Sequence, residues 1–121
     1  NENQLQVVQM VTNFPLVGVI FTVLAAPIIE ELTYRYYLYK GLEKKSVLLA
    51  FVVTVFLFAA MHLIPSISSG TLLQDMRSLP AYMLASFLFT YAYYRSKKIG
   101  VPIVAHMFYN GFAVIMMFVA G

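Results

Sequence analysis

The segment Ser46–Ile64, SVLLAFVVTVFLFAAMHLI, determines the fold expected of this chain. It belongs to a longer stretch, between Lys45 and Asp75, that contains no Asp, Glu, Lys or Arg. A helix of about 20 mostly apolar residues is long enough to cross a hydrocarbon core of ~30 Å. The segment therefore predicts a membrane-spanning helix.

The rest of the chain has the same character. Residues 78–94 and 99–121 are also free of Asp, Glu, Lys and Arg. The 121 residues are 61% hydrophobic and 11% charged, with a mean hydropathy of +0.79, whereas soluble domains are about 45–50% apolar and about 25% charged. This composition disfavours a soluble helical bundle. We predict an all-α, polytopic transmembrane helical bundle with four spans, at about residues 14–39, 46–64, 79–95 and 101–120.

The domain organisation is simple. The four expected spans form one unit, residues 1–121, with no linker or internal repeat. The chain opens NENQLQ, without an initiator Met or a basic signal region, so we expect a segment of a longer protein that lacks preceding N-terminal helices. There are no cysteines, which excludes disulfides and thiolate chemistry within these residues.

Basic residues gather in two expected loops, 40–46 and 95–100, and tyrosines precede both. Positive charge in short loops marks the cytoplasmic side of a membrane protein, and aromatic residues collect at the interface. Four alternating spans place both loops on one side, so both are predicted to be cytoplasmic. The net charge of +3 is interpreted as a topology signal for a protein in the lipid bilayer, and no nucleic-acid partner is expected.

Strongly polar side chains are scarce within the expected spans. Ionisable groups at membrane depth usually face the bundle interior and are functional by default. The strongly polar residues are Glu30, Glu31, Arg35, His62, His106 and Asn110.

The acidic pair lies in PIIEELTYR, residues 27–35. Glu31 and Arg35 are four residues apart, a spacing that places them on one helix face and predicts an ion pair. Glu30 points elsewhere and has no local cation, which suits a general base. Pro27 should kink the helix or free backbone carbonyls beside it. The alternative is a structural ion pair with Glu30 at the interface.

Two further motifs carry histidine. His62 follows Phe58 by four residues in FLFAAMHLI, and His106 precedes Asn110 by four in HMFYNGF. Asn110 could fix the His106 tautomer, or both could donate to an oxyanion. Taken singly, His62 is more typical of a core histidine bonded to a carbonyl. If the spans alternate regularly across the membrane, the two histidines would differ in depth by roughly 14 Å. For them to meet in one site, the helices must be steeply tilted, one helix must be broken, or the second span must start later.

Together the motifs predict one intramembrane site. A glutamate and two histidines can polarise a water molecule directly, or through a zinc ion with an open position. Because the His-Glu-x-x-His pattern is absent, a metal site would need ligands from three helices. Glu30, His62 and His106 are the candidate ligands if a metal is used.

The three motifs, in this order and on separate hydrophobic helices, resemble the CPBP family. That family contains type II CAAX prenyl endopeptidases and bacterial proteins linked to bacteriocin processing or self-immunity, also called Abi. The resemblance covers residues 27 to about 112.

The resemblance implies an intramembrane endopeptidase, either a metalloprotease or a glutamate-dependent enzyme. Its peptide or protein substrate would lie at the membrane, as a membrane-associated and in some members prenylated C-terminus, or a bacteriocin-type peptide. By position, Glu30 and His62 would activate the attacking water, and His106 and Asn110 would stabilise the oxyanion. Glu31 would support the site or share the catalytic work. Arg35 and Phe58 would be supporting residues.

Three alternatives differ in class. The first is a catalytically silent bacteriocin self-immunity protein on the same scaffold. The second is a membrane haem protein ligated by His62 and His106, which leaves the glutamates and Arg35 unexplained. The third is a proton-coupled transporter, for which four spans without a repeat are few.

Overall fold

A computed structural model describes all residues, 1–121, and every regular element in it is a helix. The predicted all-α class is therefore confirmed. In chain order the elements are α1 (Glu2–Asn13), α2 (Pro15–Ile20), η1 (Phe21–Ala25), α3 (Ala26–Glu31), η2 (Leu32–Tyr39), α4 (Lys40–Glu43), α5 (Val47–Met61), α6 (Ile64–Ser69), α7 (Leu72–Asp75), η3 (Met76–Ser78), α8 (Leu79–Ser96) and α9 (Gly100–Ala120).

Residues Pro15–Glu43 form one long helical rod, which ends four residues beyond the predicted end near residue 39. Two of its segments, η1 and η2, have the wider π-helical turn. The first lies directly before Pro27, where the proline ring would collide with a carbonyl in a regular α-helix. The disturbance expected at Pro27 therefore takes the form of a π-helical turn.

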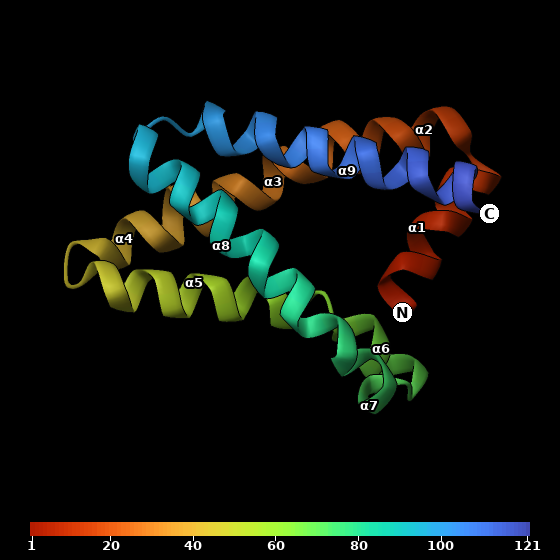
Figure 1. The fold of residues 1–121 in the computed structure, drawn as a ribbon, viewed down its shortest axis with the longest axis horizontal. Coiled ribbons are helices and arrows are strands. Elements are labelled where there is room, and N and C mark those ends of the chain that lie inside the picture. Colours follow the sequence, from red (N-terminus) through yellow and green to blue (C-terminus); the bar gives the residue numbers. More distant parts are fainter.

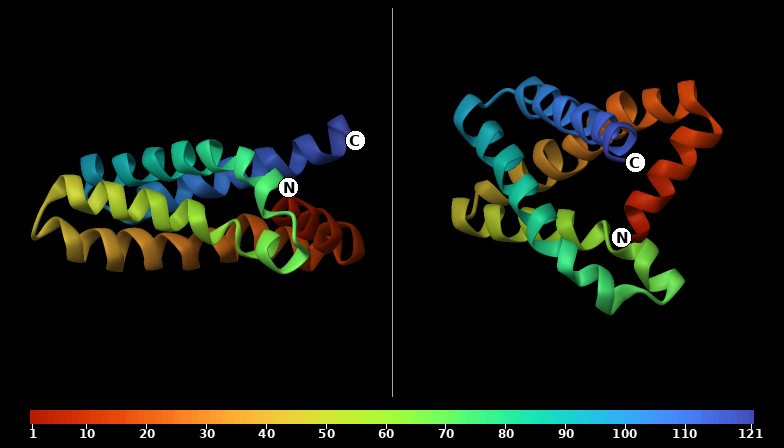
Figure 2. Two further views of the ribbon diagram at one scale, coloured as in Figure 1. Left: turned by 90° about the horizontal axis from the view of Figure 1, so that it is seen from below. Right: turned by 45° about the vertical axis from the view of Figure 1, so that its right-hand side comes forward.

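Three more long helices pack beside this rod. The Ser46 hydroxyl accepts a hydrogen bond from the Leu49 N–H and caps the start of α5. Helix α8 packs mainly against α5, and α9 packs against α8, η1 and α3. Figure 1 shows α8 crossing obliquely between α5 and α9. In Figure 2 the C-terminal turns of α9 extend away from the other helices.

Three helices are long and apolar enough to cross a membrane: Pro15–Glu43, Val47–Ser69 and Gly100–Ala120. They correspond to the predicted spans 14–39, 46–64 and 101–120. The fourth predicted span, 79–95, is helical as α8, but it is not among these three. The sequence of α8 contains four tyrosines together with Ser86, Thr90 and Arg95, which lower its hydropathy.

Helix α1 was not anticipated from the sequence. It folds back from α2 at a tight corner, where Gly18 packs against the backbone of Val11. Its other end approaches α6 (Figure 1), and the Glu2 N–H donates to the carboxylate of Asp75, the last residue of α7, at 2.8 Å. The two basic loops, 40–46 and 95–100, lie at the opposite end of the molecule from this corner, as Figure 1 shows. Alternating topology predicted that they share one end.

Candidate active site

The acidic residues lie at the centre of a buried ionic cluster. Glu31 and Arg35 are both fully buried, and Arg35 Nη1 lies 3.2 Å from Glu31 Oε1. The ion pair expected from their spacing is therefore present. The same Glu31 oxygen lies 2.8 Å from Nδ1 of His106, so one carboxylate connects the first rod with α9.

Arg35 is held in place from α8. Its Nε donates to the Thr90 hydroxyl at 3.2 Å, and its Nη2 donates to both the carbonyl and the hydroxyl of Ser86, each at 2.7 Å. Thr90 in turn donates to the Ser86 carbonyl. Sequence reasoning missed Ser86 and Thr90. Their spacing of four residues on an otherwise apolar and aromatic helix was the available signal.

The Phe58 ring packs against this cluster. The ring is 2% exposed and lies 4.6 Å from the centre of the Arg35 guanidinium. The His106 ring is 5.9 Å away, centroid to centroid. On the other side, Phe89 stacks on His106 at 4.4 Å. Phe58 thus has the surroundings of the supporting residue that the sequence suggested, and Phe89 is an additional one.

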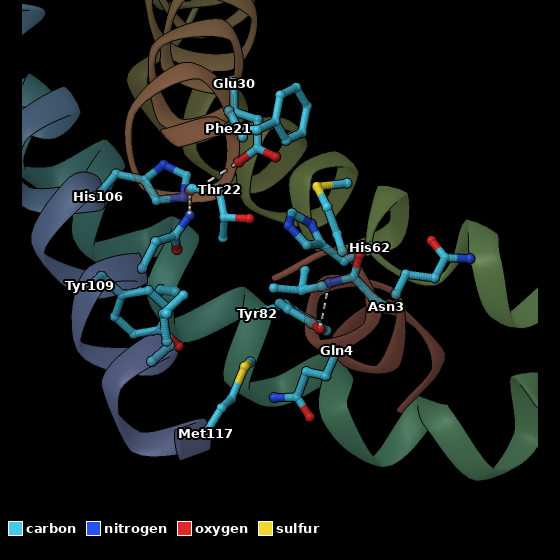
Figure 3. Close-up of a pocket in the computed structure, with 18 of the residues that line it drawn as sticks. Asn3, Gln4, Phe21, Thr22, Glu30, His62, Tyr82, His106, Tyr109 and Met117 are labelled. Carbon is cyan, nitrogen blue, oxygen red and sulfur yellow. Dashed lines mark hydrogen bonds and ion pairs between the residues drawn. The ribbon is translucent and has the colours of Figure 1, made fainter. Parts of the chain in front are cut away.

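Glu30 differs from Glu31 in its access to the site cavity. The Glu30 side chain is 21% exposed, and its Oε2 lies 3.4 Å from Nε2 of His106. Each ring nitrogen of His106 therefore faces a carboxylate oxygen: Nδ1 faces Glu31 and Nε2 faces Glu30. Figure 3 shows Glu30 and His106 together on one wall of the pocket. Of the two glutamates, Glu30 is the one that a molecule in the pocket can reach.

His62 lies across the pocket from this pair (Figure 3). Its Nδ1 is 2.8 Å from the Phe58 carbonyl. Because a carbonyl only accepts, Nδ1 carries the proton and Nε2 is left as an acceptor. The ring stacks on Tyr82 at 4.5 Å. His62 is thus bonded to a carbonyl, as a core histidine would be, and it also lines the pocket without an ion pair to either glutamate.

Asn110 is engaged with the protein backbone. Its Nδ2 donates to the Thr22 carbonyl on η1 at 2.9 Å, while the residue also lines the pocket. The sequence paired Asn110 with His106 as an oxyanion donor or as the group that fixes its tautomer. The tautomer role is wrong for this arrangement, because both His106 nitrogens face glutamates.

The two histidines line a single cavity of about 280 Å³ despite the depth offset expected from their positions. Helix α9 begins nearer the middle of the molecule than α5 does (Figure 1). Counting depth from the ends of the helices therefore misplaced His106. The cavity is closed on one side by α1, which contributes the lining residues Asn3, Gln4, Gln6, Val7 and Met10.

The candidate zinc ligands were tested against this geometry. No group of three or more His, Cys, Asp or Glu side chains is arranged so that it could hold a metal ion. His106 faces Glu31 and Glu30 with its two nitrogens, and neither carboxylate forms a hydrogen bond or ion pair with His62. The three predicted ligands, Glu30, His62 and His106, do not fit a metal site in this arrangement.

Comparison with known proteins agrees with the motifs. Residues 12–112 match the family described as type II CAAX prenyl endopeptidase Rce1-like, and this range includes every residue of the cluster. The chain belongs to this family. The CPBP resemblance seen in the sequence is thereby confirmed. Membership of a family of membrane peptidases is also consistent with the three helices that are apolar enough to span a bilayer.

Two relatives illustrate the family. The chain is 34% identical over 116 residues to the "Putative membrane peptidase YdiL" of Bacillus subtilis, covering 96% of this chain and 43% of that protein. It is 28% identical over 104 residues to the "Membrane-embedded CAAX protease MroQ" of Staphylococcus aureus, covering 80% of this chain and 38% of that protein. The chain thus spans about two fifths of the length of these relatives. No solved structure matches it.

Proposed function

We propose that these residues form the catalytic unit of an intramembrane endopeptidase in which Glu30 is the general base. The observation that carries the proposal is the contrast between the two glutamates. Glu31 is sealed behind Arg35 and His106, whereas Glu30 is partly exposed in the cavity and 3.4 Å from His106. A carboxylate supported by a buried ionic cluster and open to a cavity can take a proton from a bound water.

The reaction follows from these positions. Glu30 takes one proton from a water molecule, whose oxygen attacks the carbonyl carbon of the scissile peptide bond. The unprotonated Nε2 of His62 accepts a hydrogen bond from the same water. Glu30 then passes its proton to the leaving nitrogen as the C–N bond breaks, which yields a carboxylic acid and an amine. The acid proton finally moves to the amine, so the products are a carboxylate and an ammonium group and Glu30 is again a carboxylate. Atoms and charge balance without a further reactant.

The oxyanion of the tetrahedral intermediate needs a donor in the cavity. His106 is suited to this when both of its ring nitrogens carry a proton, because Nδ1–H then donates to Glu31 and Nε2–H can donate on the Glu30 side of the cavity. Preorganised donors in a site that excludes water are usually the largest single contribution to catalysis. Glu31 and Arg35 orient His106 and have no direct part in the bond changes.

The substrate we propose is a peptide segment at the membrane. The cavity is lined by apolar and amide side chains of α1 and α9, which suits an extended apolar peptide. Whether that peptide must carry a prenyl group is decided by comparing a farnesylated C-terminal peptide with its unmodified counterpart. We further propose that loops 40–46 and 95–100 face the cytoplasm. Labelling of a cysteine introduced at Lys45 by an impermeant maleimide checks this, since these residues contain no cysteine of their own.

The deciding experiment uses the purified intact protein and its Glu30→Gln variant with both peptides. Glu30→Gln should reduce cleavage by at least about 100-fold, in line with typical contributions of a general base. Glu43→Gln is the matched control, because Glu43 is exposed at the end of the same rod. Cleavage that survives Glu30→Gln would refute the assigned base. If wild type cleaves neither peptide, the non-catalytic immunity function becomes the better proposal.

The sequence prediction of zinc is tested on the same samples. Metal analysis of the purified protein, with and without chelator treatment, reports stoichiometry directly. The mechanism proposed here expects cleavage to persist after chelation. Loss of cleavage on chelation and its return with zinc would replace it with a metal-dependent one.

A further inference from the structure

A carbonyl group of the first rod lacks its usual helical partner. In an α-helix the Thr22 carbonyl would accept from the N–H of residue 26. Here the Ala26 N–H donates to Phe21 instead, in the π-helical register of η1. The donor next along the rod would be residue 27, and that residue is proline, which has no N–H. Neither register therefore supplies a backbone donor to Thr22.

Asn110 supplies the missing donor from another helix. Its Nδ2 lies 2.9 Å from the Thr22 carbonyl oxygen, and the two residues are 88 positions apart in the chain. In a hydrocarbon environment no water is available to pair with an unsatisfied backbone carbonyl, so such a group is strongly unfavourable. The need of the Thr22 carbonyl for a donor thus holds the Asn110 amide to η1.

The position of this bond relates it to the active site. Asn110 is one turn beyond His106 on α9, and Pro27 is three residues before Glu30 on the rod. Pro27 is also fully buried. The rod and α9 are therefore joined at two neighbouring levels, by His106 with the two glutamates and by Asn110 with Thr22. Figure 3 shows Thr22 beside the Glu30–His106 pair.

We propose that Pro27 and Asn110 act as a matched positioning pair. Pro27 creates an unpaired carbonyl at Thr22, and Asn110 uses it to fix the register of α9 so that His106 meets Glu30 and Glu31. Asn110 is then a positioning residue that acts through His106 with one of its two amide N–H groups. Because this role presumes the peptidase proposed above, its test includes a measurement that does not depend on cleavage.

The experiment is a double-mutant cycle on the intact protein with Pro27→Ala, Asn110→Ala and the combined variant. Alanine at residue 27 restores an N–H. Whether the rod keeps its π register or returns to the α register, Thr22 then gains a backbone donor. Asn110→Ala should raise the unfolding equilibrium constant by roughly five- to 150-fold in the Pro27 background, the range for a buried acceptor that is left without a donor. In the Pro27→Ala background the same change should have little effect.

Cleavage measured on the same four proteins should show the same coupling, with Asn110→Ala lowering kcat more than it raises KM only when Pro27 is present. An oxyanion donor would instead lose the same factor in kcat in both backgrounds and leave stability unchanged, which would overturn the proposal. Absence of cleavage by wild type leaves the stability cycle intact, so failure of the proposed function is distinguishable.

One further variant keeps the test decisive if Pro27→Ala does not fold. Asn110→Asp has nearly the same shape, but its carboxylate cannot donate to Thr22 and would repel it. It should destabilise the protein at least as much as Asn110→Ala. Equal stability of Asn110→Asp and wild type in denaturant titrations would exclude the positioning role.

Discussion

Replacing Arg35 by methionine is expected to destabilise this protein by about 3–5 kcal/mol, the usual cost of removing one partner of a buried ion pair. Methionine keeps most of the buried volume against Phe58, so the effect isolates charge and hydrogen bonding. Arg35 is fully buried and forms four hydrogen bonds, to Glu31, to Thr90 and to two atoms of Ser86.

The magnitude follows from how these bonds are replaced. Hydrogen bonds to charged groups contribute about 1.5–3 kcal/mol each, so four of them set an upper limit of about 6–12 kcal/mol. Thr90 already donates to the Ser86 carbonyl, so the loss of Arg35 leaves the neutral groups of Ser86 and Thr90 with little additional cost. The main cost falls on Glu31, because Glu30 and Glu31 would then share the single imidazole of His106.

The assay is unfolding of the purified protein in mixed micelles with increasing sodium dodecyl sulfate, followed by circular dichroism. The matched variant combines Arg35→Met with Glu31→Gln, which removes both charges and should recover at least about 2 kcal/mol of the loss. A single variant that loses less than about 1 kcal/mol, or a double variant no more stable than the single one, would refute the assignment of Glu31 and Arg35 as a mutually dependent buried pair.

Three further changes test the surroundings of the site. The Ser66 hydroxyl and other donors hold the pKa of Asp75 below its ordinary value of 3.8, so its contribution to stability is present above that pH and is lost as the pH falls through the lowered pKa. Acid unfolding curves of wild type should therefore fall below about pH 4 more steeply than those of Asp75→Asn. Gly18→Ala places a Cβ 2.8 Å from the Val11 Cα and should cost about 1–3 kcal/mol, seen as faster proteolysis of α1. Gly41→Ala, with nothing within 4 Å of its Cβ, is the control for that measurement and should leave proteolysis unchanged.

Local helical spacing explains what the sequence could predict. Glu31 and Arg35 pair because residues four apart share a helix face, and that geometry needs no knowledge of the fold. The same logic separated Glu30 from its neighbour, and the structure gives Glu30 the more exposed carboxylate. Hydropathy likewise located the long helices, although it placed the end of the first one four residues too early.

Contacts between helices account for what the sequence missed. That His106 faces both glutamates depends on where α9 begins, and counting residues from the basic loops gave a wrong depth. Asn110 binds a backbone carbonyl whose availability depends on a π-helical turn, a feature with no signature beyond Pro27. Helix α1 escaped notice because its amide side chains look like a polar terminus until they are seen to line the cavity.

Part of the low hydropathy of α8 is linked to the burial of Arg35. The buried positions of α8 are Ala85, Ser86, Phe89, Thr90 and Tyr93, which form one face of the helix. Two of them, Ser86 and Thr90, are the groups that hold the guanidinium. A helix that packs polar side chains around a buried cation must sacrifice apolar character on that face, since a charge in an apolar interior needs hydrogen-bonding partners. Ser86 and Thr90, which with the tyrosines and Arg95 separate α8 from the three apolar helices, are therefore a requirement of the ionic cluster. Replacing Ser86 and Thr90 by apolar residues would raise the hydropathy of α8 and remove the partners that allow Arg35 to be buried.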